Sequence, residues 1–228
     1  WARALSWRQG QARAALVSLD VVALDASAVA GIRQQAAARA GVPAEALMVC
    51  CTHTHAGPLT FPYRGMGPVD PAYLRRLQNA AVEAVAQAVA GEAPARLAYA
   101  RVPVQIGVNR RERRDRRTVL GQNPDGPVVP YAHVVRCDLE TGRRAVLFSH
   151  ACHGTVLGRS NLLISADFAG AACRYLEQAT GAAAVFVNGA CGDVSPQRTN
   201  GDFDAVEALG AQLGAAVAGA LEGAAPVR

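Results

Sequence analysis

Residues 14–52, AALVSLDVVALDASAVAGIRQQAAARAGVPAEALMVCCT, contain three elements whose order decides the fold. Residues 14–24 are rich in Val and Leu and predict a strand buried on both faces, residues 26–40 predict a helix, and residues 47–52 predict a second strand. This order is typical of an α/β unit, in which functional groups gather where strands run into loops. The sequence therefore predicts an α/β fold.

The remaining chain continues the alternation of strands and helices. Residues 71–91 carry apolar residues at helical spacing, with Asp70 placed as N-cap and Gly91 as the C-terminal stop. No internal repeat or domain boundary is visible, so we expect one domain, a mixed β-sheet flanked by helices, over residues 1–228. The further expected elements are strands over 97–108, 132–138, 144–149 and 183–188 and helices over 167–180 and 202–221.

Composition and charge narrow the class of protein. The chain is 51% hydrophobic and 18% charged, as soluble globular domains are, and no stretch approaches the ~20 apolar residues of a membrane span. Its 23 basic residues are all Arg, which indicates a coding bias more than a particular partner. The dense basic run at 110–117 has no aromatic residue for base stacking, so we expect a solvated loop and no nucleic-acid partner.

The six cysteines lack the close, regular spacing of a disulfide scaffold or a zinc knuckle. Their neighbours are mostly apolar, so we expect small buried side chains and a reducing, cytoplasmic setting. Secretion stays open, because the start at Trp1 reads like the middle of a domain rather than a true N-terminus.

Four of the five histidines follow two apolar strands. His53 and His55 flank Thr54, and in extended backbone residues two apart project to the same face, which is a common way to build half of a zinc site. His150 and His153 follow the strand at 144–149 and would reach the same kind of sheet edge. A hydrogen-bonded pair of structural histidines is the alternative for either pair alone, but the clustering favours a metal site.

A third strand end leads into Gly189-Ala-Cys-Gly-Asp-Val-Ser-Pro196. Glycines there permit tight turns and bring backbone N–H groups close to a ligand. Ser195 in this loop could act as a nucleophile or stabilise a developing oxyanion, and the residues alone leave both open.

Taken in order, these segments resemble the N-terminal catalytic domain of the neutral, or alkaline non-lysosomal, ceramidases. Thr52-His-Thr-His-Ala-Gly-Pro58 resembles that family's Thr-His-Thr-His-Ser-Gly-Pro, and Gly192-Asp-Val-Ser-Pro196 its Gly-Asp-Val-Ser-Pro. Gly107-Val-Asn-Arg110 resembles its Asn-Arg element, and His153-Gly-Thr followed by Ile164-Ser-Ala-Asp167 its His-Gly-Thr and Ile-Ser-Gly-Asp.

The resemblance implies a zinc-dependent amidohydrolase that cleaves an N-acyl amide such as ceramide, with a small-molecule or lipid substrate. His53 and His153 would bind the zinc ion, His55 would transfer protons and contact substrate, and Ser195 would occupy the proposed nucleophile position. Arg110, Asp167 and the backbone at Gly192 would contact substrate. Short N-acyl amines are a further substrate class, and the oligomeric state is not assigned.

The chain also departs from the family pattern. Phe168 and Ala169 replace Asn and Lys of the family's Asp-Asn-Lys-Gly element, which resembles shorter bacterial relatives. The family completes its zinc site with a Glu and a Tyr further downstream, so residues 1–228 resemble a catalytic domain truncated at both ends. Two alternatives follow, a metal-independent serine hydrolase that uses Ser195 with a His, and a non-catalytic incomplete domain.

Overall fold

The first β-α-β unit forms one side of the molecule. In this computed structural model, which describes residues 1–227, β2 (Ala12–Leu19) and β3 (Leu47–Cys51) are parallel and joined through α1 (Ala26–Ala40). The helix begins where the Asp25 carboxylate accepts a hydrogen bond from the Ala28 N–H, and it ends at Gly41, whose φ of 63° suits glycine. Antiparallel β1 (Ala2–Gln9) completes a sheet of order β1-β2-β3.

A second β-α-β unit forms the other side. β8 (Arg144–His150) and β9 (Ala183–Asn188) are parallel and joined through α3 (Asp167–Thr180). They belong to a five-stranded sheet of order β11-β4-β7-β8-β9, whose other members are antiparallel. Those members are β4 (Ala95–Pro103), β7 (Tyr131–Leu139) and the short β11 (Ala225–Pro226).

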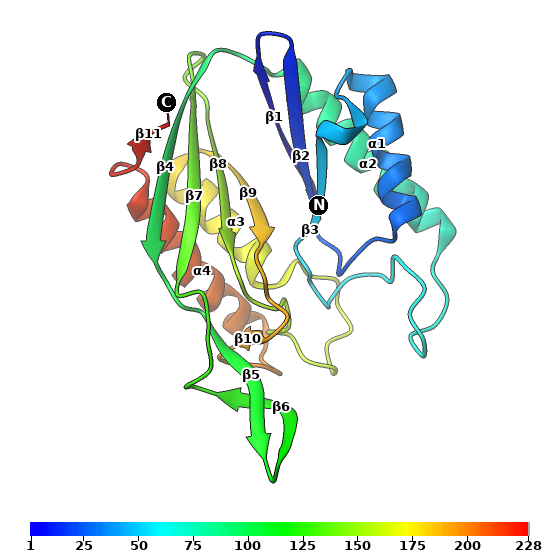
Figure 1. The fold of residues 1–228 in the computed structure, drawn as a ribbon, viewed down its shortest axis with the longest axis vertical. Helices are drawn as coiled ribbons and strands as arrows, with labels where there is room; N and C mark the ends of the chain where they lie inside the picture. The colour runs from blue at the N-terminus through cyan, green and yellow to red at the C-terminus, as the bar shows by residue number, and fades with distance from the viewer. Residues whose placement is uncertain (228) are drawn as a thin grey trace.

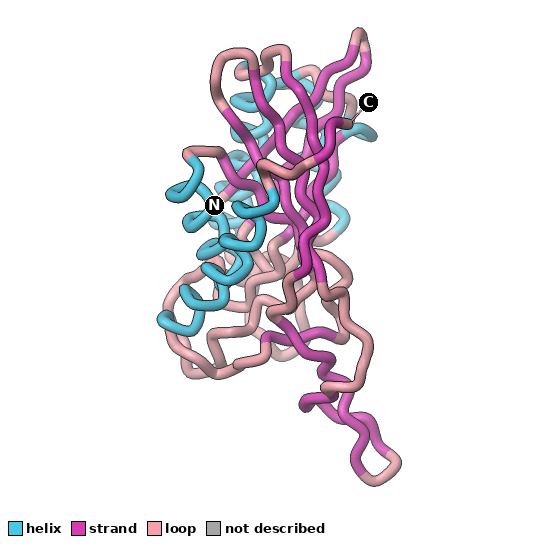
Figure 2. The backbone as a smooth tube through the Cα atoms, turned by 90° about the vertical axis from the view of Figure 1, so that its left-hand side faces the viewer, coloured by secondary structure: helices cyan, strands magenta, loops and turns pink. Residues whose placement is uncertain are grey.

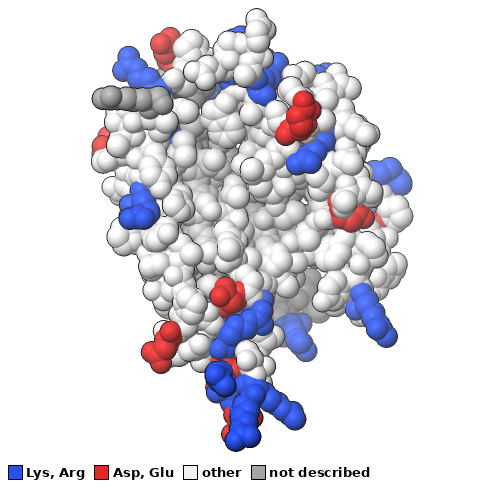
Figure 3. All heavy atoms as spheres, in the orientation of Figure 1, with Lys and Arg blue, Asp and Glu red and all other residues white. Residues whose placement is uncertain are grey.

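A third, small sheet projects from the end of the molecule. It has the order β10-β5-β6 and consists of β5 (Gly107–Arg114), β6 (Arg117–Asn123) and β10 (Val194–Pro196). The β5–β6 hairpin extends away from the other strands (Figure 2), and its arginines form the dense basic group at the bottom of the space-filling view (Figure 3).

Helices and sheets enclose two separate hydrophobic cores. α1 and α2 (Pro71–Ala90) pack beside β1, β2 and β3, whereas α3 and α4 (Phe203–Ala220) pack behind the five-stranded sheet (Figure 1). A short 3₁₀ turn, Ala44–Ala46, precedes β3. The first core centres on Val17, Leu19, Ile32 and Leu47, and the second on Phe148, Phe168, Phe186 and Leu213.

The structure confirms the α/β fold with mixed sheets, and it corrects several details. The strands form three sheets rather than one, and β1 was not expected. The expected strand at 97–108 divides because Pro103, which lacks an N–H for further pairing, ends β4, and β5 begins in another sheet. The expected strand at 14–24 ends at Leu19. The expected loop at 110–117 is an exposed hairpin, because strand pairing satisfies its backbone hydrogen bonds while its side chains stay solvated.

No helix within residues 1–227 is both long and apolar enough to cross a bilayer.

The crossing of α3 and α4 gives a first prediction. A Cβ atom added at Gly210 would lie 2.3 Å from the Ala171 Cβ and 2.8 Å from the Ala172 backbone nitrogen, so the two helices touch at this glycine. Gly210→Ala should therefore lower the free energy of unfolding by about 1–3 kcal/mol through overpacking, as measured by urea denaturation. Gly219→Ala on the same helix meets nothing within 4 Å and should be neutral or stabilising; equal losses in both variants would contradict the packing explanation.

Candidate metal centre

The carboxyl ends of the two parallel strand pairs meet at one place, and His53 lies there directly after β3. Its backbone has a φ of 65°, in the left-handed region, so the chain leaves the strand conformation of β3 at this residue. The His53 Nδ1 atom lies 2.8 Å from the Val22 carbonyl oxygen in the loop after β2. This contact fixes the direction of the ring.

The loop that follows β8 approaches the His53 loop closely. Thr54 and Gly154 form a parallel bridge, in which the His55 N–H donates to the Gly154 carbonyl at 2.9 Å. A Cβ atom at residue 154 would lie 2.7 Å from the His53 carbonyl oxygen and 2.9 Å from the Thr54 Cα. Only glycine at position 154 permits this approach.

His153 precedes that glycine and is 7% exposed. Its backbone N–H donates to the Val194 carbonyl at 3.0 Å, and its Nδ1 lies 2.7 Å from the Cys191 carbonyl oxygen. Burial, together with the positive charge of Arg110, lowers the pKa of the His153 imidazole to about 4 despite the hydrogen bond to Cys191. His153 is therefore neutral near pH 7, which is the form that binds metal ions.

Three imidazole nitrogens face one point. The Nε2 atoms of His53 and His153 are 3.0 Å apart, and the Nε2 of His55 lies 3.4 Å from that of His53. Carbonyl oxygens only accept hydrogen bonds, so the Nδ1 atoms of His53 and His153 carry the protons in the neutral rings, and their Nε2 lone pairs point at each other.

Facing lone pairs repel unless a cation lies between them. Zinc bound tetrahedrally by two imidazoles holds their nitrogens about 3.4 Å apart, close to the separation of the His53 and His153 Nε2 atoms. Each ring also donates its other N–H to a backbone carbonyl, the arrangement that commonly orients metal-bound histidines. His53 and His153 therefore fit a metal ion.

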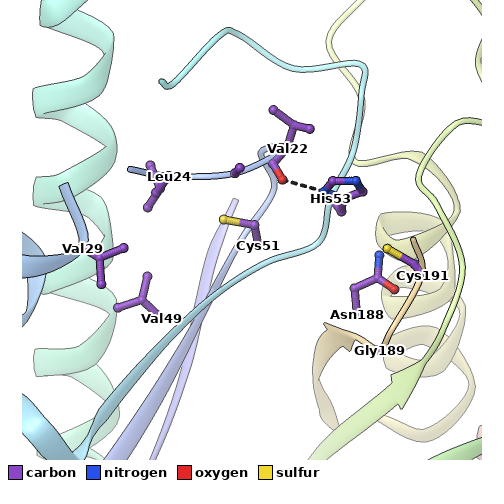
Figure 4. Close-up of a pocket in the computed structure, with 10 residues that line it drawn as sticks. Val22, Leu24, Val29, Val49, Cys51, His53, Asn188, Gly189 and Cys191 are labelled. Carbon is purple, nitrogen blue, oxygen red and sulfur yellow. Dashed lines mark hydrogen bonds between the residues drawn. The ribbon is translucent and has the colours of Figure 1, made fainter. Parts of the chain in front are cut away.

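Cys191 joins this cluster and was not among the residues expected there. Its sulfur and the ligand nitrogens of His53 and His153 all lie within 4.8 Å of one another. The sequence signal was its place in the Gly-rich loop after β9, four residues before Ser195. Its side chain and His53 also line a cavity of about 330 Å³ with the largely apolar residues Val22, Ala23, Leu24, Val29, Val49 and Cys51 (Figure 4).

Arg110 holds the loop that carries Cys191. Its Nε and Nη2 donate to the Gly192 carbonyl at 3.1 and 2.8 Å, and Arg111 Nη2 donates to the same oxygen at 3.0 Å. Burial and the neighbouring Arg111 charge lower the pKa of the Arg110 guanidinium, but it stays charged near neutral pH. Gly192 is exposed, and no hydrogen bond within residues 1–227 uses its N–H.

Ser195 lies on β10, opposite Val108 of β5. Within residues 1–227 its hydroxyl makes no hydrogen bond to a histidine. A serine activated by His55 or His153 needs such a contact, although it often forms only with substrate bound.

Asp167 and His150 lie outside the cluster. Asp167 is 1% exposed, and its carboxylate accepts hydrogen bonds from the N–H groups of Val156, Leu157 and Phe168. In this position it organises the start of α3, and its expected contact with substrate stays a prediction. His150 is buried with its Nδ1 against the Tyr131 carbonyl, and burial lowers the pKa of its imidazole.

The fold and the cluster together define an α/β protein with a candidate metal centre at the carboxyl ends of its parallel strands. Neutral ceramidase from Pseudomonas aeruginosa matches 95% of this chain with a TM-score of 0.78 and 23% identity. A ceramidase complexed with C2 matches 95% with a TM-score of 0.72 and 22% identity. The chain spans 38% and 37% of these two proteins.

No protein-family model and no curated protein sequence matches the chain. The structural likeness therefore carries the comparison, and it shows that the chain has the neutral ceramidase fold over part of that protein's length. The fold implied by the sequence resemblance is confirmed.

The close approach at Gly154 gives a second prediction. Gly154→Ala should push the His53 and His153 loops apart and lower the free energy of unfolding by about 1–3 kcal/mol in urea denaturation. Gly192→Ala, in the neighbouring loop, meets nothing within 4 Å and should leave stability within about 0.5 kcal/mol. A Gly154→Ala protein as stable as the wild type would show that the bridge is not constrained by sterics.

Proposed function

We propose that this chain forms part of a zinc-dependent hydrolase that cleaves an N-acyl amide of the ceramide type. The observation that carries the proposal is the pair of His53 and His153 Nε2 atoms, 3.0 Å apart with their lone pairs facing. The likeness to two solved ceramidases supports the substrate class. Fold alone does not assign a function, so the proposal depends on the chemistry of the site.

In this proposal His53 and His153 hold the ion. A bound zinc ion supplies Lewis-acid polarisation of the amide carbonyl and lowers the pKa of water. The Val22 and Cys191 carbonyls would hold the two imidazoles in the orientation that leaves each Nε2 free for the ion.

His55 is suited to move a proton. Its side chain is exposed at the edge of the cluster, so it can reach a substrate as well as solvent. Partial burial and the neighbouring His53 and Arg110 lower the pKa of its imidazole, which leaves the ring neutral and able to accept a proton near pH 7. We assign to His55 the uptake of a proton from the attacking water and its transfer to the leaving amine.

The loop after β9 can receive the negative charge that develops on the acyl oxygen. The Gly192 N–H would donate to that oxygen, and Arg110 adds positive charge while its guanidinium anchors the loop through the Gly192 carbonyl. The apolar cavity beside His53 is suited to an apolar substituent of the amide.

The third prediction tests the metal. In the complete protein, His53→Ala and His153→Ala should each lose bound zinc, measured by elemental analysis, and lose hydrolysis of a short-chain N-acylsphingosine. Chelation should abolish the activity and added zinc restore it. His133→Ala is the matched control, because His133 lies exposed on β7 against the Tyr99 hydroxyl and should keep both metal and activity.

Activity that survives chelation but is lost in Ser195→Ala would replace this proposal with the serine hydrolase. Full zinc in both histidine variants would remove the metal assignment.

The fourth prediction separates the roles of the two histidines in the Thr-His-Thr-His motif. His55→Ala should retain zinc yet lose about 10²–10⁴-fold in kcat, because it removes proton transfer rather than a ligand. The pH profile should also lose the limb that reports the His55 imidazole. Loss of zinc in this variant would instead make His55 a ligand.

A further inference from the structure

We propose that Cys191 is a third ligand of the metal, bound through its thiolate, so that two imidazoles and one sulfur hold the ion. This inference rests on the proposed function, which supplies the metal. It adds a sulfur donor to the two imidazole nitrogens.

The position of the sulfur carries this inference. The Cys191 Sγ lies within 4.8 Å of the ligand nitrogens of both His53 and His153. The three residues follow three different strands, β3, β8 and β9, and they converge although they are far apart in sequence. Figure 4 shows the Cys191 sulfur directed toward the His53 ring.

The backbone of Cys191 adds a second argument. Its carbonyl oxygen accepts the hydrogen bond that fixes the His153 ring, at 2.7 Å from Nδ1. Cys191 therefore orients the His153 ring through its backbone carbonyl and offers its own sulfur as a ligand. The sulfur is thus held at a fixed position relative to the His153 Nε2 atom. Arg110 and Arg111 secure this loop through the next carbonyl, that of Gly192.

A cysteine ligand changes the chemistry of the site. Binding of M²⁺ replaces the Cys191 S–H bond with a metal–sulfur bond and releases the proton to solvent, so the loaded cluster carries a net charge of +1 instead of +2. Two imidazoles and one thiolate favour zinc, cadmium or cobalt over magnesium or calcium, which prefer oxygen ligands. Cys191 would be a third donor from residues 1–227 and would leave the remaining positions of the ion for other ligands or for substrate.

Cobalt(II) provides the direct test. Wild-type protein loaded with cobalt should show a sulfur-to-cobalt charge-transfer absorption in the near ultraviolet. Cys191→Ser should lose this band and bind zinc at least about 10–100-fold more weakly, since loss of outer-shell partners alone costs that much. Cys51→Ser is the matched control, because Cys51 lines the same cavity but lies outside the cluster, and it should keep the band.

A second measurement covers the case in which Cys191→Ser does not fold. In metal-free wild-type protein, iodoacetamide should alkylate Cys191, and zinc should slow that reaction more than about tenfold by mass spectrometry. The rate at Cys50, which is also partly exposed, should not change.

The outcomes separate the two proposals. A cobalt-loaded wild type without a charge-transfer band, or a band that persists in Cys191→Ser, overturns the thiolate ligand while the histidine metal site stands. Alkylation of Cys191 at the same rate with and without bound zinc also overturns the thiolate ligand. Failure of the wild type to bind cobalt or zinc at micromolar concentration overturns both.

Discussion

The candidate site depends on the bridge between the loop after β3 and the loop after β8. The hydrogen bond from the His55 N–H to the Gly154 carbonyl, 2.9 Å long, brings together segments about a hundred residues apart. The two loops emerge from sheets with separate hydrophobic cores, so nothing in either core alone places His53 against His153. The absence of a side chain at Gly154 allows this approach, and the left-handed backbone at His53 then turns the first ring toward the second.

Much of the architecture could be predicted from local patterns. Helices α1 and α3 and strand β9 have the bounds expected from the sequence, because the local residue pattern indicates where each element begins and ends. Sheet membership could not be predicted in the same way, because it depends on partners far along the chain. The β5–β6 hairpin shows the limit, since its arginines give no apolar alternation and its strands are defined by pairing alone.

The sequence predicted that histidines gather at the candidate site, but it did not predict how their side chains are arranged. His53 and His153 face each other at their Nε2 atoms, and the left-handed backbone at His53 gave no signal in the sequence. Cys191 was assigned to the class of buried small side chains, because its apolar neighbours give no indication of the two rings that the fold brings near it. His150 is the opposite case. Its position at a strand end suggested that it belongs to the cluster, but its Nδ1 atom lies against the Tyr131 carbonyl oxygen instead.

The separation into two cores has a consequence for how the protein unfolds. The side chains of Ser18 and Asn188 connect the two halves through backbone carbonyls of Phe186 and Thr52, at 2.6 and 3.1 Å. Arg3 on β1 also donates to Glu177 and to the Ala184 carbonyl, and the histidine loops add a further connection. An ion shared by His53 and His153 would act as a cross-link between the halves, and its binding energy would couple their stabilities. Metal binding at the carboxyl ends of the two sheets would then determine how cooperatively the two halves unfold, in addition to its role in the chemistry.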